Sequence, residues 1–104
     1  VSATNQDLSL GVEVDSVAVS TVSTVEWLVT VKSATTSTNR RTVKIIALND
    51  GTITNIDYNV YSKLRVGSAI SGLSFDVIGN AGNMSLEITA SENVDYNVSR
   101  ITLG

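Results

Sequence analysis

Apolar and polar residues alternate with a period of two along most of the chain. The clearest case is Val25, Trp27, Val29 and Val31, which alternate with polar residues such as Glu26, Thr30 and Lys32. Successive side chains of a β-strand point to opposite faces, so this pattern predicts a strand that is buried on one side only. No segment keeps the 3.6-residue period of an amphipathic helix. The alternation therefore predicts an all-β fold.

Residues 1–104 are expected to form one domain, because a chain of this length supports a single core. About seven to nine short strands separated by turn signals are typical of an antiparallel β-sandwich or jelly roll. The Asn49–Thr52 turn contains an Asp-Gly pair, which favours a tight hairpin. Residues 60–70 are the least regular and are expected to hold a crossover loop or one turn of helix. The further strands are expected at residues 8–19, 42–48, 53–60, 73–77, 84–90 and 94–103.

For two of the predicted strands the sequence also predicts which side chains share a face. In the strand at residues 8–19, one side is formed by Leu8, Leu10, Val12 and Val14. In the last strand, the apolar positions change phase between residues 98 and 101. One inserted residue reverses the faces of all later side chains, so the phase change predicts a β-bulge at residues 99–100.

The composition excludes several kinds of chemistry. The chain has no Cys, His or Pro, so disulfides, thiolate zinc sites, haem ligation by His and Ser-His-Asp catalysis are ruled out. The net charge is -3, and Arg40–Arg41 is the only basic pair, which argues against nucleic acid as a partner. No apolar run reaches the roughly 18 to 20 residues needed for membrane insertion.

Acidic residues are the remaining candidates for catalysis. Asp57, Asp76, Glu87 and Asp95 lie on separate predicted strands, where two carboxylates could meet for glycosidic acid and base chemistry. Asp57, Asp76 and Glu87 fall in the polar phase of their strands, which favours solvent-facing carboxylates instead. Asp50 is expected to cap backbone amides in its turn. We expect no catalytic residue and no enzyme activity.

Calcium is the least improbable metal, because hard cations take carboxylate, amide and backbone oxygens. Asn49–Asp50 and Asn80–Asn83 are oxygen-rich turns, but neither has EF-hand spacing. We expect no metal and no cofactor.

Four aromatic residues could form a sugar-binding face, since sugar rings stack on flat apolar surfaces. Trp27, Tyr58 and Tyr96 share the phase of apolar neighbours and are expected in the core. Tyr61 breaks phase with its neighbour and is expected to be the exposed ring. A single exposed ring would make a poor sugar platform.

From Trp27 to Gly104 the chain carries a fixed order of motifs: W-L-V-T-V, an apolar strand ending in D-G-T, I-D-Y-N-V-Y, L-S-F-D-V, G-N-A-G-N-M-S-L and a closing R-I-T-L-G. This order resembles small β modules of tailed bacteriophage virion proteins, of the fibre, neck, baseplate or head decoration type in marine and cyanobacterial phages. They cover about three quarters of the chain. The first 24 residues have no counterpart, and they are expected to form an added strand or a docking arm.

The resemblance implies a non-enzymatic structural protein of the virion, assembled in the host cytoplasm. Its implied place is the tail, neck or fibre, and its implied partners are other virion proteins, further copies of itself with a trimer favoured, and a host-surface glycan. Two alternatives stay open: a decoration protein that cements the capsid, and a carbohydrate-binding module of a secreted protein. The chain starts at Val1 without Met, which is expected of a processed protein or a fragment.

Basic side chains are the candidate subunit contacts, because guanidinium groups pair well with carboxylates. Surface solubility is the competing explanation for each of them. Together with the Tyr61 ring, the expected interface residues are Arg40, Arg41, Arg65 and Arg100, and Lys63 could also take part.

Overall fold

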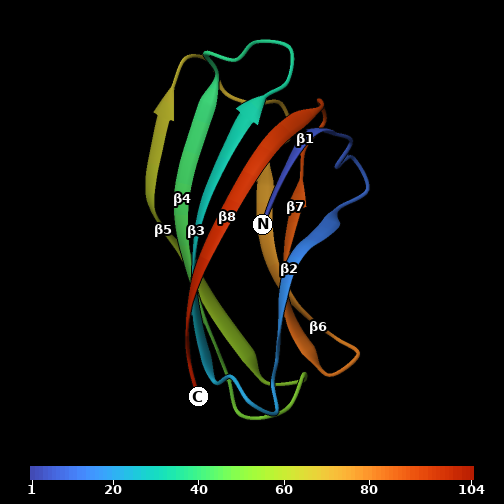
Figure 1. The fold of residues 1–104 in the computed structure, drawn as a ribbon, viewed down its shortest axis with the longest axis vertical. Helices are drawn as coiled ribbons and strands as arrows, with labels where there is room; N and C mark the ends of the chain where they lie inside the picture. The colour runs from blue at the N-terminus through green and yellow to red at the C-terminus, as the bar shows by residue number, and fades with distance from the viewer.

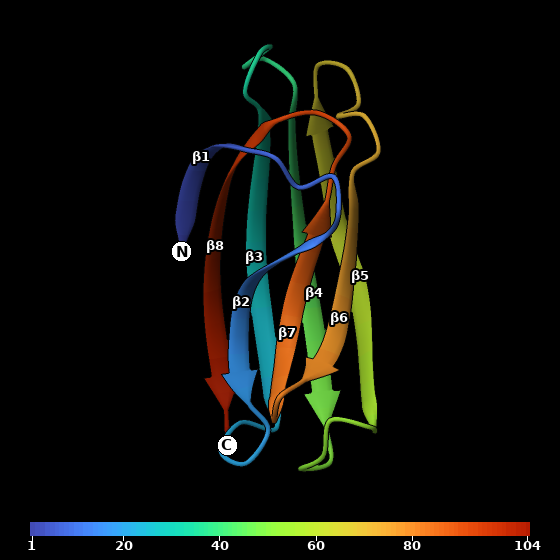
Figure 2. The ribbon, with the colours of Figure 1, turned by 90° about the vertical axis from the view of Figure 1, so that its right-hand side faces the viewer.

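The computed structural model describes all residues from 1 to 104 and contains eight β-strands (Figure 1). No helix is present that could span a membrane. The strands form two antiparallel sheets packed face to face, with orders β1-β8-β3-β4-β5 and β2-β7-β6 (Figure 2). The predicted all-β antiparallel sandwich is therefore confirmed. The strands are β1 (Ser2–Gln6), β2 (Val12–Ala18), β3 (Thr24–Ser33), β4 (Arg40–Asn49), β5 (Ile56–Val66), β6 (Ser74–Asn80), β7 (Asn83–Thr89) and β8 (Val94–Leu103).

The core lies between the inner faces of the two sheets. β3 supplies Val25, Trp27, Val29 and Val31, all fully buried, as the alternation of this segment predicts. β3 lies in the middle of the five-stranded sheet, paired with β8 on one side and β4 on the other. Branched and aromatic side chains fit this pleated, half-buried surface, which explains why the segment forms the central strand. Burial of this stripe in the core that both sheets share holds the two sheets together.

The sheets differ in width, and this difference leaves the outer strands partly uncovered. Tyr58 on β5 has an inward phase, yet it is 37% exposed. The prediction that Tyr58 belongs to the core is wrong, because β5 is the edge of the wider sheet. Tyr96 is half-buried and packs against the core. Tyr61 is half-buried as well, so Tyr58 rather than Tyr61 is the more exposed ring.

The N-terminal part contains an added strand and a bulge. β1 pairs with β8, and the Val1 ammonium donates to the Val98 carbonyl at 2.9 Å. In β2 the register shifts between Glu13 and Asp15. Leu10 lies outside any strand and is 96% exposed, so the expectation that it shares one buried face with Leu8 is wrong.

β8 runs without a bulge. Its pairing with β3 is unbroken from the Ser33–Val94 pair to the Thr24–Leu103 pair. The bulge predicted at residues 99–100 is therefore absent. Ile101 keeps the outward phase and is 70% exposed, because its apolar side chain lies on the solvent side of the sheet.

The wide sheet has register shifts elsewhere, one between Ala3 and Gln6 of β1 and one in β5. The pairing of β4 with β5 shifts register between Thr42 and Lys44, and Ser62 has a positive φ of 53°. Residues 60–70 were expected to hold a loop or a helical turn, but β5 continues through Val66. The bulge explains the irregular pattern, because it exchanges the two faces of the strand at this point.

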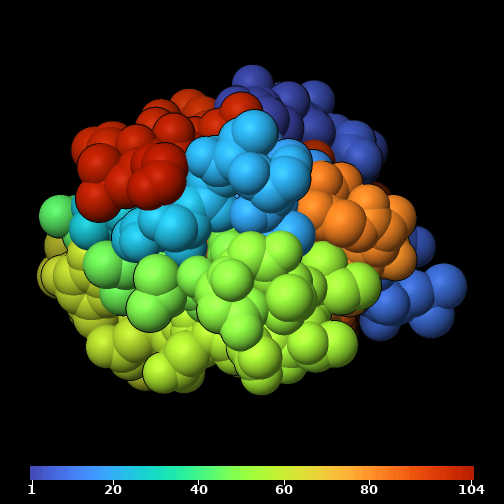
Figure 3. Space-filling view, turned by 90° about the horizontal axis from the view of Figure 1, so that it is seen from below, coloured from blue at the N-terminus to red at the C-terminus, as the bar shows by residue number.

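The loop between β4 and β5 closes one end of the sandwich. Asp50 accepts hydrogen bonds from the Thr52 amide at 3.0 Å and the Thr52 hydroxyl at 2.7 Å, so its predicted turn role is confirmed. Figure 3 views the molecule from this end and shows the yellow-green loop beside the orange β6–β7 turn. A Cβ atom on Gly79 would lie 2.3 Å from the Ile53 carbonyl oxygen, so only glycine permits this contact.

Candidate functional site

Three surface features could serve in binding. The first is a cavity at the side of the sandwich, between the edge strands β5 and β6, which we call the side cavity. Its volume is about 240 Å³. It is lined by Arg41 of β4, Val60 and Lys63 of β5, Leu73 just before β6, and Phe75 of β6.

Edge-to-edge contact positions the side cavity. The Tyr58 hydroxyl donates to the Asp76 carboxylate at 2.7 Å and so joins β5 to β6 across the gap between the sheets. This bond is the first cause of the raised pKa of Tyr58, and burial adds to it. Figure 2 shows the two strands on the same side of the molecule. This bond links the two strands that supply Val60, Lys63 and Phe75 to the cavity walls.

The side cavity carries positive charge without an acidic partner. The ion pairs of the chain are Lys32 with Asp95 at 3.6 Å and Arg100 with Asp15 at 2.9 Å, so neither Arg41 nor Lys63 is paired. The Nε atom of Arg41 is enclosed and has no hydrogen-bond partner. An enclosed donor that lacks a partner costs about 1–3 kcal/mol.

The second feature lies on the outer face of the five-stranded sheet, away from the core. Five large apolar side chains there are between 39% and 70% exposed. The pairing register places them on three adjacent strands near one end of the sheet. We call this set the outer apolar band; it consists of Leu28, Ile46, Leu48, Ile101 and Leu103.

A gathering of exposed apolar side chains on one face is typical of surfaces that bind other molecules. Leu28, Ile46 and Leu48 gave a sequence signal, because each is apolar at a position in the outward phase of its strand. Ile101 and Leu103 gave no such signal, because the phase change in the last strand predicts a bulge that would turn them inward. Glu26 lies between Ile46 and Ile101 of the band and accepts a hydrogen bond from the Tyr61 hydroxyl. That bond is the main cause of the raised pKa of Tyr61.

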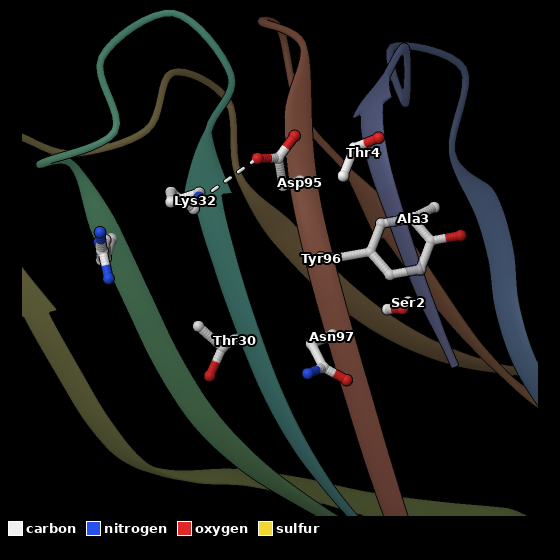
Figure 4. A pocket seen from close by; sticks show the side chains of 9 residues that line it. Ser2, Ala3, Thr4, Thr30, Lys32, Asp95, Tyr96 and Asn97 are labelled. Carbon is white, nitrogen blue, oxygen red and sulfur yellow. Dashed lines mark ion pairs between the residues drawn. The ribbon is translucent and has the colours of Figure 1, made fainter.

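The third feature is a polar hollow at the other end of the same outer face, with a volume of about 240 Å³. Figure 4 shows Lys32 and Asp95 pointing toward each other there, with Thr30 and Asn97 beside them. Arg40 also lines the hollow, and its Nε atom donates to the Ser37 carbonyl at 2.8 Å. Ala3 and Tyr96 are the apolar residues that line this hollow, and the other seven lining residues are polar or charged.

The five predicted contact residues are therefore spread over the molecule. Arg41 and Arg65 are direct register partners on β4 and β5. Arg40 lies at the polar hollow and Tyr61 beside the outer apolar band. Arg100 bonds within the chain, to Asp15 and to the Ser16 carbonyl. Their contact with partners stays a prediction.

The acidic residues form no metal-binding group of three or more carboxylates. Asp76 accepts the Tyr58 hydrogen bond, and Asp95 pairs with Lys32. Asp76 and Glu87 are register partners on β6 and β7.

No family model matches the chain, and no curated protein matches it. Among solved structures, it is similar to the tailspike protein of Acinetobacter baumannii phage AM24, with 9% sequence identity and a TM-score of 0.48. The similarity covers 99% of this chain and 25% of the tailspike chain. The chain thus spans a quarter of the length of that protein.

Proposed function

We propose that the chain is a non-enzymatic structural module of a tailed bacteriophage virion, in the tail, neck or fibre, and that it assembles through the outer apolar band. The observation that carries the proposal is the band itself, five exposed apolar side chains on one rigid sheet face. Burial of such a surface contributes about 25 cal/mol for each Å² removed from water, and this gain offsets the loss of translational and rotational freedom on association. The resemblance of the motif order to phage virion modules supports the virion as the place of assembly.

The partner in this proposal is a further copy of the chain, in a symmetric oligomer with a trimer favoured. The band alternates with charged side chains, since Glu26 lies between Ile46 and Ile101 and Lys44 lies beside Leu28. Opposite charges interspersed in an apolar patch can fix the register of two copies and discourage unrelated partners. The charges therefore support a defined self-contact.

The test is the mass of the chain in solution at micromolar concentration, measured by sedimentation. The expected result is an oligomer that the double variant Ile101→Glu and Leu103→Glu converts to single chains. Leu10→Glu is the matched control, because Leu10 is exposed outside the band. A mass of one chain for the unchanged protein would contradict the self-contact. Localisation of the chain in a reconstructed virion tests the particle role, and a position on the head would favour capsid decoration.

A further inference from the structure

The bulge in β5 brings basic side chains to the inner side of the strand. Before the bulge, Val60 pairs with the inward-facing Ile45, and Tyr61 points outward. After the bulge, Arg65 pairs with Arg41, so the odd-numbered positions take the inward phase. In an unbroken strand, Lys63 and Arg65 would project from the opposite face. The bulge therefore re-aims Lys63 into the side cavity.

This arrangement has a conformational cost in the free chain. Ser62 holds a left-handed φ of 53°, which residues other than glycine adopt rarely. The bulge also places two arginines directly opposite each other, and like charges at opposed positions of a sheet repel. No carboxylate of the chain compensates Arg41, Lys63 or Arg65. An anionic ligand would supply the missing partner.

The walls of the side cavity define the rest of the ligand. Val60, Leu73 and Phe75 are half-buried apolar residues that also pack against the core. A flat or partly apolar body fits against such a wall, and sugar rings present a C–H face of this kind to aromatic side chains. The volume of about 240 Å³ is on the scale of one monosaccharide ring. A free phosphate ion would leave the apolar wall without contact.

We propose that the side cavity binds a sugar that carries a carboxylate, with Arg41 and Lys63 holding the carboxylate and Phe75 packing against the ring. Arg41 lines the cavity, and the guanidinium fork matches the two oxygens of a carboxylate. The site gives a chemical class to the host-surface glycan of the proposed virion protein, and in that respect it rests on the proposed function. It lies at the sandwich edge, away from the outer apolar band.

The experiment is a titration of the isotope-labelled protein with sodium glucuronate, followed by amide chemical shifts. We expect saturable shifts at residues 41, 60, 63 and 75, with an affinity in about the millimolar range that is usual for a single sugar contact. Glucose tests the need for the carboxylate, and sodium acetate tests the need for the ring. Both are expected to bind at least about tenfold more weakly than glucuronate.

Variants locate the site. Arg41→Gln and Lys63→Gln should each weaken glucuronate binding about tenfold, since each removes one charged partner. Lys63 is exposed, so Lys63→Gln keeps the test valid if Arg41→Gln does not fold. Arg40→Gln is the matched control, because Arg40 is the chain neighbour of Arg41 but lies at the polar hollow. The Arg40→Gln variant should bind glucuronate with the same affinity as the unchanged protein.

Three results would overturn the proposal: no shifts at the cavity residues, equal binding of glucose or acetate, or preference for a Glu-containing peptide over glucuronate. The solution mass is measured on the same samples. If the unchanged protein is a single chain in solution but still binds glucuronate, only the proposed assembly role is contradicted. If it forms oligomers but does not bind glucuronate, only the proposed sugar site in the side cavity is contradicted.

Discussion

The Arg100 guanidinium lies 2.9 Å from the Asp15 carboxylate and so joins β8 of the five-stranded sheet to β2 of the three-stranded sheet. The other carboxylate oxygen of Asp15 accepts a hydrogen bond from the Trp27 indole nitrogen at 2.9 Å. One carboxylate thus connects both sheets through the largest side chain of the core. Arg100 lies on the side of β8 that faces the three-stranded sheet. The strand therefore continues without a bulge and places Ile101 on the outer side.

Removal of this carboxylate should destabilise the fold. Asp15→Ala leaves the buried indole N–H of Trp27 unpaired and Arg100 without a partner, and an unsatisfied buried donor costs about 1–3 kcal/mol. Arg100→Ala should cost less, about 1 kcal/mol, because its side chain is 45% exposed and its pairing is weakened by solvent. Urea unfolding under conditions where the protein is a single chain measures both. Equal stability of Asp15→Ala and the unchanged protein would contradict the assigned bond.

Gly79→Ala should loosen the closed end of the sandwich. The added methyl group would lie 2.3 Å from the Ile53 carbonyl oxygen, so the loop or β6 must move. Overpacking of this kind costs about 1–3 kcal/mol. Thermal unfolding measures the loss. Gly104→Ala is the control, since its nearest neighbour would be the Thr21 carbonyl oxygen at an ordinary 3.5 Å.

Acid should weaken the contact between β3 and the β7–β8 loop. The Ser33 hydroxyl donates to Glu92 at 2.5 Å and the Ser71 amide donates at 3.1 Å. The Ser33 bond, followed by the Ser71 amide, lowers the pKa of Glu92 below its ordinary 4.5. Because the folded-state pKa is lower, this stabilisation is present above pH 4.5 and is lost as the pH falls through the folded-state value.

The measurement is the melting temperature between neutral pH and about pH 2. Glu92→Gln should melt lower at neutral pH and should lose less stability on acidification than the unchanged protein. Parallel pH profiles for the two proteins would show that Glu92 does not contribute. Asp50 and Asp7, whose pKa values are also lowered, contribute equally to both profiles.

Alkali should reveal the bond between β5 and β6. The hydrogen bond to Asp76 raises the pKa of Tyr58 above its ordinary value of 10.0. The stabilisation is therefore complete below pH 10 and is lost as the pH rises through the folded-state pKa. Asp76→Asn should shift one tyrosine transition to lower pH in an ultraviolet absorbance titration. Tyr58→Phe should remove that transition, and its persistence would assign it to another tyrosine.

The period-two pattern predicted the sandwich and the central strand, because burial of one face leaves a direct trace in the sequence. It did not predict the outer apolar band. Ile101 and Leu103 are apolar on a solvent-facing side, and alternation alone cannot distinguish a partner-facing side from a core-facing side. Tyr58 was assigned to the core for the related reason that alternation does not report how far the opposite sheet extends.

The side cavity could be predicted only in part from the sequence. Arg41 and Arg65 were expected as contact residues, but their pairing depends on the bulge at Ser62. No glycine, proline or asparagine marks that position, so ordinary turn chemistry gives no signal there. The walls formed by Leu73 and Phe75 depend on the approach of β6, which is a property of the packed sandwich.

The free edge of β5 has eleven residues, which is long enough to recruit an extended strand from another molecule. Unprotected edges of this kind seed fibrils. The irregularity at Ser62 interrupts the row of unpaired backbone groups, and the adjacent lysine and arginine repel a parallel copy of themselves. The chain can therefore be kept at high concentration without uncontrolled growth from this edge.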